Sequence, residues 1–432
     1  MFRESLRYME KKRLNIILFL LTILCVQPLI FAQKQGFELT SKRKKKVTLP
    51  FELIHNLIVL PLKINDSEDL FFILDTGVST TLITEIPNGE GFSINFTKVV
   101  KLSGLGDEST NEALFSEGNE IFVKGIKGSN QDVVLLLEDS FFLTSIMGRQ
   151  VNGLIGYDLF KDFIIEINYP RREIHFHDPQ KFSKKYKKLK KSKKWREIPF
   201  TLRTGKPYVS AEVVQKGNPP LSVILIIDSG ASHAISLYPA SSDKILIPEP
   251  HIFSFLGTGI SGELYGEIGR VDEVHFGDYS FEEPIVFFPQ EESVKNTILF
   301  GNRNGSVGSE ILRRFNIIYN YGDKSMLIRP NKYFDEPFNY NLSGIDISTP
   351  LGNFPYFVIS NIREKSPAEK AGLQAGDELV ELNGKSAYNY SLNELFELFE
   401  DNPDKKISLV VRREDALKKF EIILVNELKP RN

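Results

Sequence analysis

Short apolar runs rich in β-branched and aromatic residues recur along the first 330 residues. Turn-forming residues separate them roughly every eight to twelve positions, which predicts short strands in a barrel or sandwich, not strands alternating with helices. Two of the runs, 70–74 and 223–227, end in related tripeptides, Asp75-Thr76-Gly77 and Asp228-Ser229-Gly230. Each aspartate is therefore expected where a buried strand leads into a tight turn.

The second half of this pattern repeats the first at a nearly constant offset. A serine lies four residues after each aspartate, a Gly-X-Gly segment begins 29 residues after each, and a segment ending in glycine follows at 81 and 80 residues. The matching landmarks are Ser79 and Ser232, Gly104–Gly106 and Gly257–Gly259, 154–156 and 306–308, Phe163 and Phe315, Asn168 and Asn320, and Tyr169 and Tyr321. A repeat of about 150 residues is longer than a solenoid repeat, so two similar all-β lobes are predicted.

If the two lobes pack about a pseudo-twofold axis, Asp75 and Asp228 meet at that axis. Two carboxyl groups in contact cannot both ionise, so they share one proton and titrate as a pair. The ionised member takes a proton from a bound water while the protonated member hydrogen-bonds a substrate carbonyl. Gly77 and Gly230 permit the tight turns and bring their N–H groups close to the carboxylates. This arrangement predicts hydrolysis that needs no metal, no cofactor and no covalent intermediate.

Other residues near the aspartates have supporting roles. The hydroxyls of Thr76 and Ser229 are expected to exchange hydrogen bonds across the lobe interface. The hydroxyls of Ser79 and Ser232 are expected to donate to the outer carboxylate oxygens and fix their orientation. Glycine-weakened strands are expected where a backbone bends or approaches a ligand. These glycines are Gly104, Gly106, Gly257 and Gly259.

The segments Asp-Thr-Gly-Val-Ser-Thr and Asp-Ser-Gly-Ala-Ser-His, with the glycine-ending segments that follow them, resemble the aspartic proteases, in particular the bacterial retropepsin-like aspartyl proteases. The resemblance covers residues 49–330. It implies a mainly β fold with two pseudo-symmetric β-barrel lobes, a substrate cleft between them, and flaps that contain the Gly-rich strands. Two features depart from the family pattern. Residues 102–112 lack the flap tyrosine of pepsin-type enzymes, whereas Tyr265 lies near the corresponding place in lobe two, and Val78 replaces the usual small residue.

The pattern changes after residue 330. Ser366-Pro367 starts a short helix that Gly372 ends, and Asn383-Gly384 makes a turn after a strand. This run resembles a PDZ domain, an α+β module that spans residues 338–428. Such domains bind extended peptides by strand addition. The alternative is a packing or regulatory domain without a free ligand.

The PDZ resemblance also implies where a peptide terminus binds. Residues 345–347 are the expected edge strand, and residues 392–399 are the helix that forms the other groove wall. The N–H groups of one loop are expected to hold a terminal carboxylate. This loop consists of Leu342, Ser343, Gly344 and Ile345.

The N-terminal segment 1–32 has the pattern of a signal peptide, with basic residues before an apolar run and cleavage expected before Gln33. The protein is therefore expected in the periplasm, in the cell envelope or outside the cell. An uncleaved membrane anchor is the alternative, and Met9 is an alternative start. Cys25 is the one cysteine and lies within the segment. Cleavage of this segment would leave a chain without cysteine, which would exclude disulfides, thiolate catalysis and cysteine-ligated metals.

Charge is segregated along the 432-residue chain. The net charge is −2, so no global basicity favours a nucleic-acid partner, and 41% hydrophobic and 25% charged residues exclude a mostly disordered or polytopic membrane chain. Nine lysines and one acidic residue lie in 178–195. This segment is read as a solvated linker, with an amphipathic membrane-surface helix as the alternative. Lys42–Lys46 is expected to be an exposed tail. His175 and His177 share a strand face, but no third metal ligand is evident.

The leading hypothesis is an exported, monomeric aspartic endopeptidase that acts on peptides or proteins. Its expected domains are lobe one (33–177), the linker (178–195), lobe two (196–332) and the PDZ domain (338–428). One alternative is a protease-shaped receptor that binds peptides without cutting them, although a pseudoenzyme usually loses one aspartate. A carboxylate-pair glycosidase is disfavoured because a contact dyad leaves less than the separation of about 5 Å that sugar hydrolysis needs.

Overall fold

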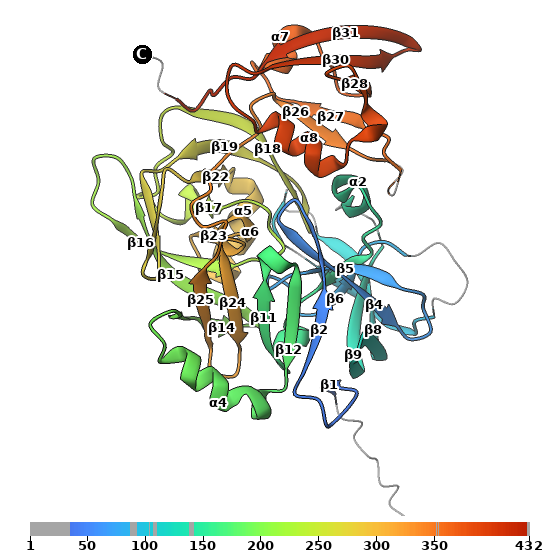
Figure 1. Cartoon of the computed structure of the whole chain (residues 1–432), viewed down its shortest axis with the longest axis vertical. Helices are drawn as coiled ribbons and strands as arrows, with labels where there is room; N and C mark the ends of the chain where they lie inside the picture. Colours follow the sequence, from blue (N-terminus) through green and yellow to red (C-terminus); the bar gives the residue numbers. More distant parts are fainter. Residues whose placement is uncertain are drawn as a thin grey trace, which may run out of the picture. The chain divides into compact units, whose positions relative to one another are not determined.

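The structure is a computed structural model that describes residues 35–86, 93–102, 104–106, 110–137, 142–350, 352 and 354–429. The expected signal peptide, its cleavage site and Cys25 lie outside the described residues. The described chain is mainly β and consists of two β-rich lobes and a smaller C-terminal module (Figure 1). In this part of the chain, no helix has the length and apolar character needed to cross a bilayer.

In the first lobe, nine described strands pair in the order β1-β9-β6-β10-β5-β4-β8-β7, with β3 beside β4. They are β1 Gly36–Leu39, β3 Glu52–Ile54, β4 Leu57–Ile64, β5 Leu70–Leu74, β6 Thr81–Ile83, β7 Phe96–Leu102, β8 Asn111–Val123, β9 Ile126–Leu136 and β10 Gly153–Ile155. The apolar run before the first aspartate forms β5, which runs parallel to β10. Pairing of β8 with β9 closes the strand path into a ring. Two short helices, α2 Leu143–Met147 and α3 Tyr157–Phe160, flank β10.

In the second lobe, ten described strands pair in the order β18-β19-β22-β17-β23-β16-β15-β20-β21, with β14 beside β15. They are β14 Thr201–Arg203, β15 Lys206–Val214, β16 Leu221–Ile227, β17 Ile235–Leu237, β18 His251–Gly259, β19 Gly262–Arg270, β20 Glu273–Phe276, β21 Tyr279–Glu282, β22 Ile285–Pro289 and β23 Gly305–Val307. β16 runs parallel to β23, as β5 does to β10. No pairing among the described strands closes this second path. The helices here are α5 Glu291–Gly301 and α6 Ser309–Leu312.

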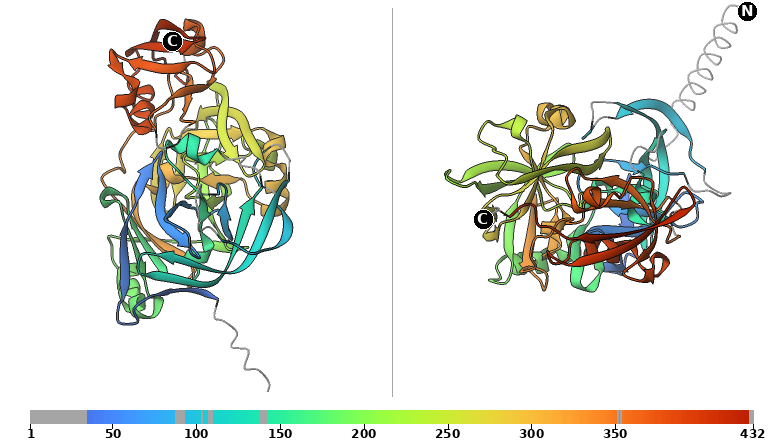
Figure 2. Two further views of the ribbon diagram at one scale, coloured as in Figure 1. Left: turned by 90° about the vertical axis from the view of Figure 1, so that its right-hand side faces the viewer. Right: turned by 90° about the horizontal axis from the view of Figure 1, so that it is seen from above.

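A six-stranded sheet joins the two lobes in the order β13-β25-β24-β11-β12-β2. Its strands are β2 Lys46–Pro50, β11 Ile164–Asn168, β12 Glu173–His177, β13 Arg196–Pro199, β24 Phe315–Asn320 and β25 Ser325–Pro330. β11 and β24 are antiparallel neighbours at its centre, and Glu166 lies opposite Ile318, its own counterpart at the offset of 152. A pseudo-twofold axis therefore passes through this pair. Figure 2 shows the same elements from two further directions.

The lysine-rich connector is a helix, not the solvated linker that the sequence predicted. α4 Pro179–Lys190 begins at Asp178, whose side chain accepts hydrogen bonds from two N–H groups of the first turn. Phe182 and Tyr186 on one face are buried and pack with Trp195 against the six-stranded sheet. Helical spacing gathers the aromatic residues on one stripe and leaves the lysines in solvent. The apolar face that suggested a membrane helix is thus covered by the protein itself.

The tract Lys42–Lys46 is only in part the exposed tail that was predicted. Lys46 begins β2, which pairs with β12. The ammonium group of Lys181 donates hydrogen bonds to the carbonyl oxygens of Lys42 and Lys44 at 2.6 and 3.0 Å. The connector helix therefore anchors this segment.

We expect Tyr186→Ala to lower the free energy of unfolding by about 3–5 kcal/mol, because it leaves a cavity where a buried ring lay. The Tyr186 side chain is 1% exposed, and its hydroxyl lies 3.0 Å from Ser325 Oγ. Chemical denaturation measures the change. Lys187→Ala on the exposed face of α4 is the control, for which we expect a change within about 0.5 kcal/mol. Equal stability of the two variants would show that α4 contributes no packing.

The C-terminal module combines one sheet with two α-helices, as the PDZ resemblance predicted. The strands pair in the order β26-β27-β28-β30-β31, with β29 beside β28. They are β26 Ile345–Ser348, β27 Val358–Ile362, β28 Glu378–Leu382, β29 Lys385–Ser386, β30 Lys406–Arg413 and β31 Ala416–Ile423. The helices are α7 Pro367–Ala371, capped by Ser366, and α8 Leu392–Phe399, with a capping box at Ser391. Single-turn 3-10 helices lie at Tyr169–Arg171, Pro239–Ser241 and Ala387–Asn389.

Candidate active site

Asp75 and Asp228 occupy equivalent places at the ends of β5 and β16. The N–H of Asp75 donates to the carbonyl oxygen of Ile155 at 2.9 Å, and that of Asp228 donates to Val307 O at 2.9 Å. Each aspartate is thus held by the strand that runs parallel to its own. The duplicated segments that end in Gly156 and Gly308 therefore position the two turns.

The two turns contact each other through their glycines. A Cβ placed on Gly230 would lie 2.3 Å from Asp75 Cγ, and one on Gly77 would lie 3.1 Å from Asp228 Oδ1. Each glycine thus leaves room for the carboxyl group of the opposite lobe. The Gly77 N–H donates to Asp75 Oδ1 at 2.6 Å, and the Gly230 N–H donates to Asp228 Oδ1 at 3.1 Å. The structure therefore brings together the two aspartates and both turn glycines that the sequence singled out.

The environment of Asp75 favours a protonated carboxyl group. Asp75 is 8% exposed. Burial raises its pKa, and the neighbouring Asp228 carboxyl raises it further, whereas the Gly77 N–H and the charge of Lys206 oppose the shift. Two adjacent carboxyl groups with this arrangement hold one proton between them.

Thr76 and Ser229 link the lobes through crossed hydrogen bonds. The Thr76 hydroxyl donates to Ile227 O at 2.6 Å and accepts from the Ser229 N–H at 2.9 Å. The Ser229 hydroxyl donates to Leu74 O at 2.8 Å and accepts from the Thr76 N–H at 3.0 Å. Both side chains are buried, so these four bonds fix the separation of the two aspartate turns.

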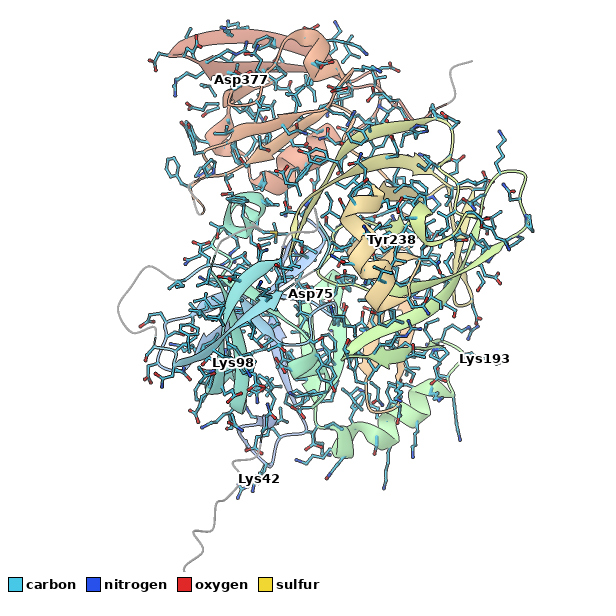
Figure 3. The ribbon with its side chains drawn as sticks, turned by 180° about the vertical axis from the view of Figure 1, so that it is seen from behind. Lys42, Asp75, Lys98, Lys193, Tyr238 and Asp377 are labelled. Carbon is cyan, nitrogen blue, oxygen red and sulfur yellow. The ribbon has the colours of Figure 1, made fainter. Side chains whose placement is uncertain are left out.

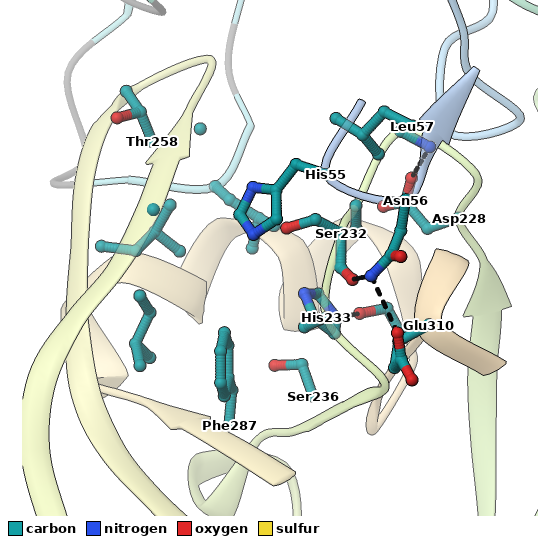
Figure 4. Close-up of a pocket in the computed structure, with 18 of the residues that line it drawn as sticks. His55, Asn56, Leu57, Asp228, Ser232, His233, Ser236, Thr258, Phe287 and Glu310 are labelled. Carbon is teal, nitrogen blue, oxygen red and sulfur yellow. Dashed lines mark hydrogen bonds between the residues drawn. The ribbon is translucent and has the colours of Figure 1, made fainter. Parts of the chain in front are cut away.

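Ser79 and Ser232 do not have the predicted contacts. The single hydroxyl proton of Ser79 goes to Thr204 O at 2.6 Å, so it does not orient Asp75. Among the described residues, no hydrogen bond joins the Ser232 hydroxyl to Asp228. The carbonyl oxygen of Ser232 instead accepts from Asn56 Nδ2 at 3.1 Å, beside the contact of Asn56 with Glu310 (Figure 4). Sequence spacing placed both serines near the turns, but it carried no information on where their hydroxyls point.

The two Gly-rich segments meet each other. Gly106 forms a bridge with Ser261, whose N–H donates to Leu105 O at 2.9 Å. The Gly104 N–H donates to Ser261 Oγ at 3.0 Å. A Cβ on Gly259 would lie 2.2 Å from Leu105 O, so this close approach requires glycine. The fourth glycine, Gly257, has a φ of +131°, and a Cβ placed on it would have no neighbouring atom within 4 Å.

The dyad and the Gly-rich segments line one cavity of about 1590 Å³. Small-molecule sites are typically about 300–1,000 Å³, so this cavity is large enough for an extended peptide. Figure 3 shows Asp75 between the lobes, with Tyr238 in the second lobe. Sequence reasoning missed several lining residues from the second lobe, because they lie outside the duplicated motif and carry no spacing signal. They are Lys206, Tyr208, Tyr238 and Arg303. His233 also lines the cavity, but it lies in the duplicated segment itself, five residues after Asp228.

The two histidines of β12 have protein partners. His177 Nε2 lies 2.9 Å from Glu166 Oε2, and His175 Nδ1 lies 2.8 Å from Thr48 Oγ1. Within the described ranges, no cluster of three or more His, Cys, Asp or Glu side chains has metal-binding geometry. These contacts give both histidines a structural role.

The expected carboxylate-binding loop of the C-terminal module has no vacant N–H group. The N–H groups of Ser343 and Gly344 donate to Asn341 Oδ1 at 3.0 and 3.1 Å. The Leu342 N–H donates to Phe399 O at 2.9 Å, and the Ile345 N–H to Ser343 Oγ at 3.0 Å. A peptide carboxylate would have to displace the Asn341 side chain, so capture of a free terminus stays a prediction.

We expect Asp75→Asn to gain thermal stability relative to the parent as pH rises. A raised pKa means that the folded protein binds this proton more tightly than the unfolded chain, so the parent loses stability above the ordinary carboxyl pKa of about 4. The asparagine variant avoids that loss. Its melting temperature should match the parent near pH 4 and exceed it by several degrees near pH 8. Asp243→Asn, at an exposed position, is the control. A constant difference across this range would contradict the raised pKa.

The similar proteins described here each match a small part of the chain. A family model described as a PDZ domain matches residues 358–413. The carboxy-terminal processing protease CtpA of Bacillus subtilis (strain 168) is 32% identical over 82 residues, which are 19% of this chain and 17% of that protein. The regulator of sigma-E protease RseP of Escherichia coli (strain K12) is 35% identical over 75 residues, 17% of this chain and 16% of that protein. The chain thus spans about a sixth of the length of these curated relatives.

One solved structure, the photosystem II D1 C-terminal processing protease, is 24% identical and covers 21% of this chain and 24% of its own. The TM-score of 0.18 carries no conclusion about the fold. The matched residues 358–413 lie within the C-terminal module, which is therefore a PDZ domain.

Proposed function

We propose that the chain is an exported aspartic endopeptidase with two retropepsin-like lobes, in which Asp75 and Asp228 activate a water. The observation that carries the proposal is the mutual approach of the duplicated turns, with each glycine against the opposite carboxyl group. The partial similarity to two proteases supports a protease-related function. The apolar N-terminal segment supports export.

The reaction follows from one shared proton. In the proposed cycle Asp75, whose pKa burial raises, is the protonated member of the pair, and Asp228 takes a proton from water. The water oxygen bonds to the carbonyl carbon of the scissile peptide, while Asp75 gives its proton to the carbonyl oxygen. The tetrahedral product then returns a hydroxyl proton to Asp75 as Asp228 protonates the leaving nitrogen. Cleavage of the C–N bond yields a carboxylic acid and an amine, and the dyad regains its single proton.

The PDZ domain supports a second peptide contact. β26 is one of the two outermost strands of its sheet, and strand addition takes place at such an edge. Several residues of β26 and α8 line the same cavity as the dyad, among them Asp346, Ile347 and Phe396. We propose that this domain binds a segment of the substrate.

Digestion of a peptide library by the chain from residue 33 onward, between about pH 3.5 and 8, tests the proposal. Mass spectrometry of the products should find cleavage with the parent and none with Asp228→Asn. Peptide binding without cleavage at any pH would favour the receptor alternative. Equal cleavage by both proteins would reject the aspartic mechanism.

A further inference from the structure

The two walls of the cavity differ in chemistry at equivalent positions. Leu154 of β10 pairs with Leu82 of β6, and the corresponding pair of the second lobe is Ser306 of β23 and Ser236 of β17. All four residues line the cavity. The duplicated framework therefore holds apolar side chains in lobe one where lobe two has hydroxyls.

The lobes also differ at the start of the strand that precedes β5 in lobe one and β16 in lobe two. Val59 of β4 lies opposite Ile73, and Tyr208 of β15 lies opposite the equivalent Ile226. Two residues earlier in these strands, both lining the cavity, lobe one has Leu57 and lobe two has Lys206. An aliphatic side chain on one side of the dyad thus corresponds to a cation on the other.

A second cation lies deeper in lobe two. Arg303 lies two residues before Gly305, and the fully buried Val151 lies two residues before Gly153, so the two positions correspond in the two lobes. Arg303 is 8% exposed, lines the cavity, and has no hydrogen-bond partner for its Nε atom. Its guanidinium lies 5.6 Å from the centre of the Tyr238 ring. Within the described part of the chain, neither Arg303 nor Lys206 has a carboxylate at ion-pair distance.

Acidic residues such as Glu263, Glu310 and Asp346 also line the cavity, but the charges that act on Lys206 beside the dyad do not balance. Burial and the nearby charge of Arg303 lower the pKa of the Lys206 ammonium group, whereas Asp75 and Asp228 oppose that shift and favour its charged form. The singly protonated dyad carries one negative charge, whereas the two basic side chains carry two positive charges. His233 adds none at neutral pH, because burial lowers its pKa to about 4. Arg303 is a buried cation without a carboxylate partner, which is costly, and an anionic group bound beside it would lower that cost.

We propose, on the basis of the peptidase function above, that the cleft selects substrates by polarity across the scissile bond. The dyad lies at the pseudo-twofold axis. Two positions that this axis relates therefore lie on opposite sides of the dyad. Leu57, Leu82 and Leu154 then contact an apolar substrate side chain on one side. Lys206 and Arg303 bind an aspartate or glutamate side chain on the other. The substrate class is a peptide with an apolar and an acidic residue flanking the cleaved bond.

Cleavage of peptides with acetylated and amidated termini tests this inference, because only side chains then carry carboxylates. Library products should show an acidic residue on one side of the cut and an apolar residue on the other. For a matched pair that differs by Glu or Gln, we expect the parent to prefer Glu by about 10–100-fold in kcat/KM. A Gln peptide with a free C-terminus tests whether a terminal carboxylate substitutes for the side chain. If it restores the rate, the selectivity for an acidic side chain is rejected.

Variants of Lys206 and Arg303, with Lys216→Met as the control, assign the effect to the pocket. Lys206→Met should reduce the Glu preference to within about threefold, mainly through KM, and Lys206→Glu should favour a Lys peptide. Lys216→Met changes an exposed lysine of the same lobe and should keep the parent preference. Melting temperatures identify variants that fail to fold, and Arg303→Met then serves as the second pocket variant.

The failure of this inference and the failure of the peptidase proposal give different results. Dyad-dependent cleavage without an acidic preference, or with a preference that Lys206→Met retains, overturns the inference alone. Cleavage by Asp228→Asn overturns the peptidase mechanism. If nothing is cleaved, fluorescence anisotropy of the Glu and Gln peptides measures the pocket directly. Tighter binding of Glu that Lys206→Met abolishes supports the inference, and equal binding overturns it.

Discussion

Asp228→Asn should lower kcat/KM for peptide cleavage by at least about 1,000-fold, because it removes the base that takes a proton from the attacking water. An asparagine has the same size, and its side-chain oxygen still accepts from the Gly230 N–H, which lies 3.1 Å from Asp228 Oδ1. The melting temperature is therefore expected to stay at or above that of the parent. Steady-state cleavage of a fluorogenic peptide and a thermal melt measure the two quantities.

Asp243→Asn is the matched control for this experiment. Asp243 is exposed on the same lobe, and no ion pair or hydrogen bond of its side chain is present in the described residues. The same change of charge at this position should leave kcat/KM within about twofold. Equal rates for Asp228→Asn and Asp243→Asn would remove Asp228 from the mechanism.

Gly230→Ala should lower kcat/KM by at least about 100-fold although it replaces no titratable residue. The added methyl group would lie 2.3 Å from Asp75 Cγ and 2.4 Å from Asp75 Oδ2, so the two turns must separate. A displacement of about 1 Å in a catalytic group costs about this factor. Overpacking should also cost about 1–3 kcal/mol of folding stability.

A second glycine variant separates this effect from a general effect of alanine. Gly322→Ala lies at an exposed turn, where the nearest atom to the new Cβ is Asn320 Oδ1 at 3.3 Å. We expect its activity to equal that of the parent. If Gly230→Ala also keeps the activity of the parent, the two carboxyl groups are farther apart than the structure indicates. The mechanism with one shared proton is then rejected.

Local patterns predicted the elements that depend on nearby residues. The apolar run 70–74 forms β5, the run 223–227 lies within β16, and the expected PDZ helix 392–399 is α8. These elements follow from burial periodicity and from caps such as Ser366 and Ser391, which act within one turn. The offset of 152 also predicted that the lobes pair symmetrically, and the register of β11 with β24 agrees.

These local patterns could not predict the direction in which a polar side chain points. The Ser79 hydroxyl bonds Thr204 O of the other lobe, a contact between residues 125 positions apart. The connector helix was read as solvated because nine lysines dominate its composition, yet Phe182 and Tyr186 bury against a sheet that both lobes build. Composition averages over a segment, whereas packing depends on which face a partner covers.

By itself, the sequence determined that this protein repeats a β-rich unit, that each copy ends a strand in an aspartate turn, and that a PDZ module follows. These features are encoded in residues close together or at a fixed offset. Only the tertiary structure decided that Gly230 lies against Asp75, and that Lys206 and Arg303 occupy positions where the first lobe has Leu57 and Val151. The reason is physical: the polarity of a cleft depends on side chains that converge from distant strands, and their convergence exists only after the chain has folded.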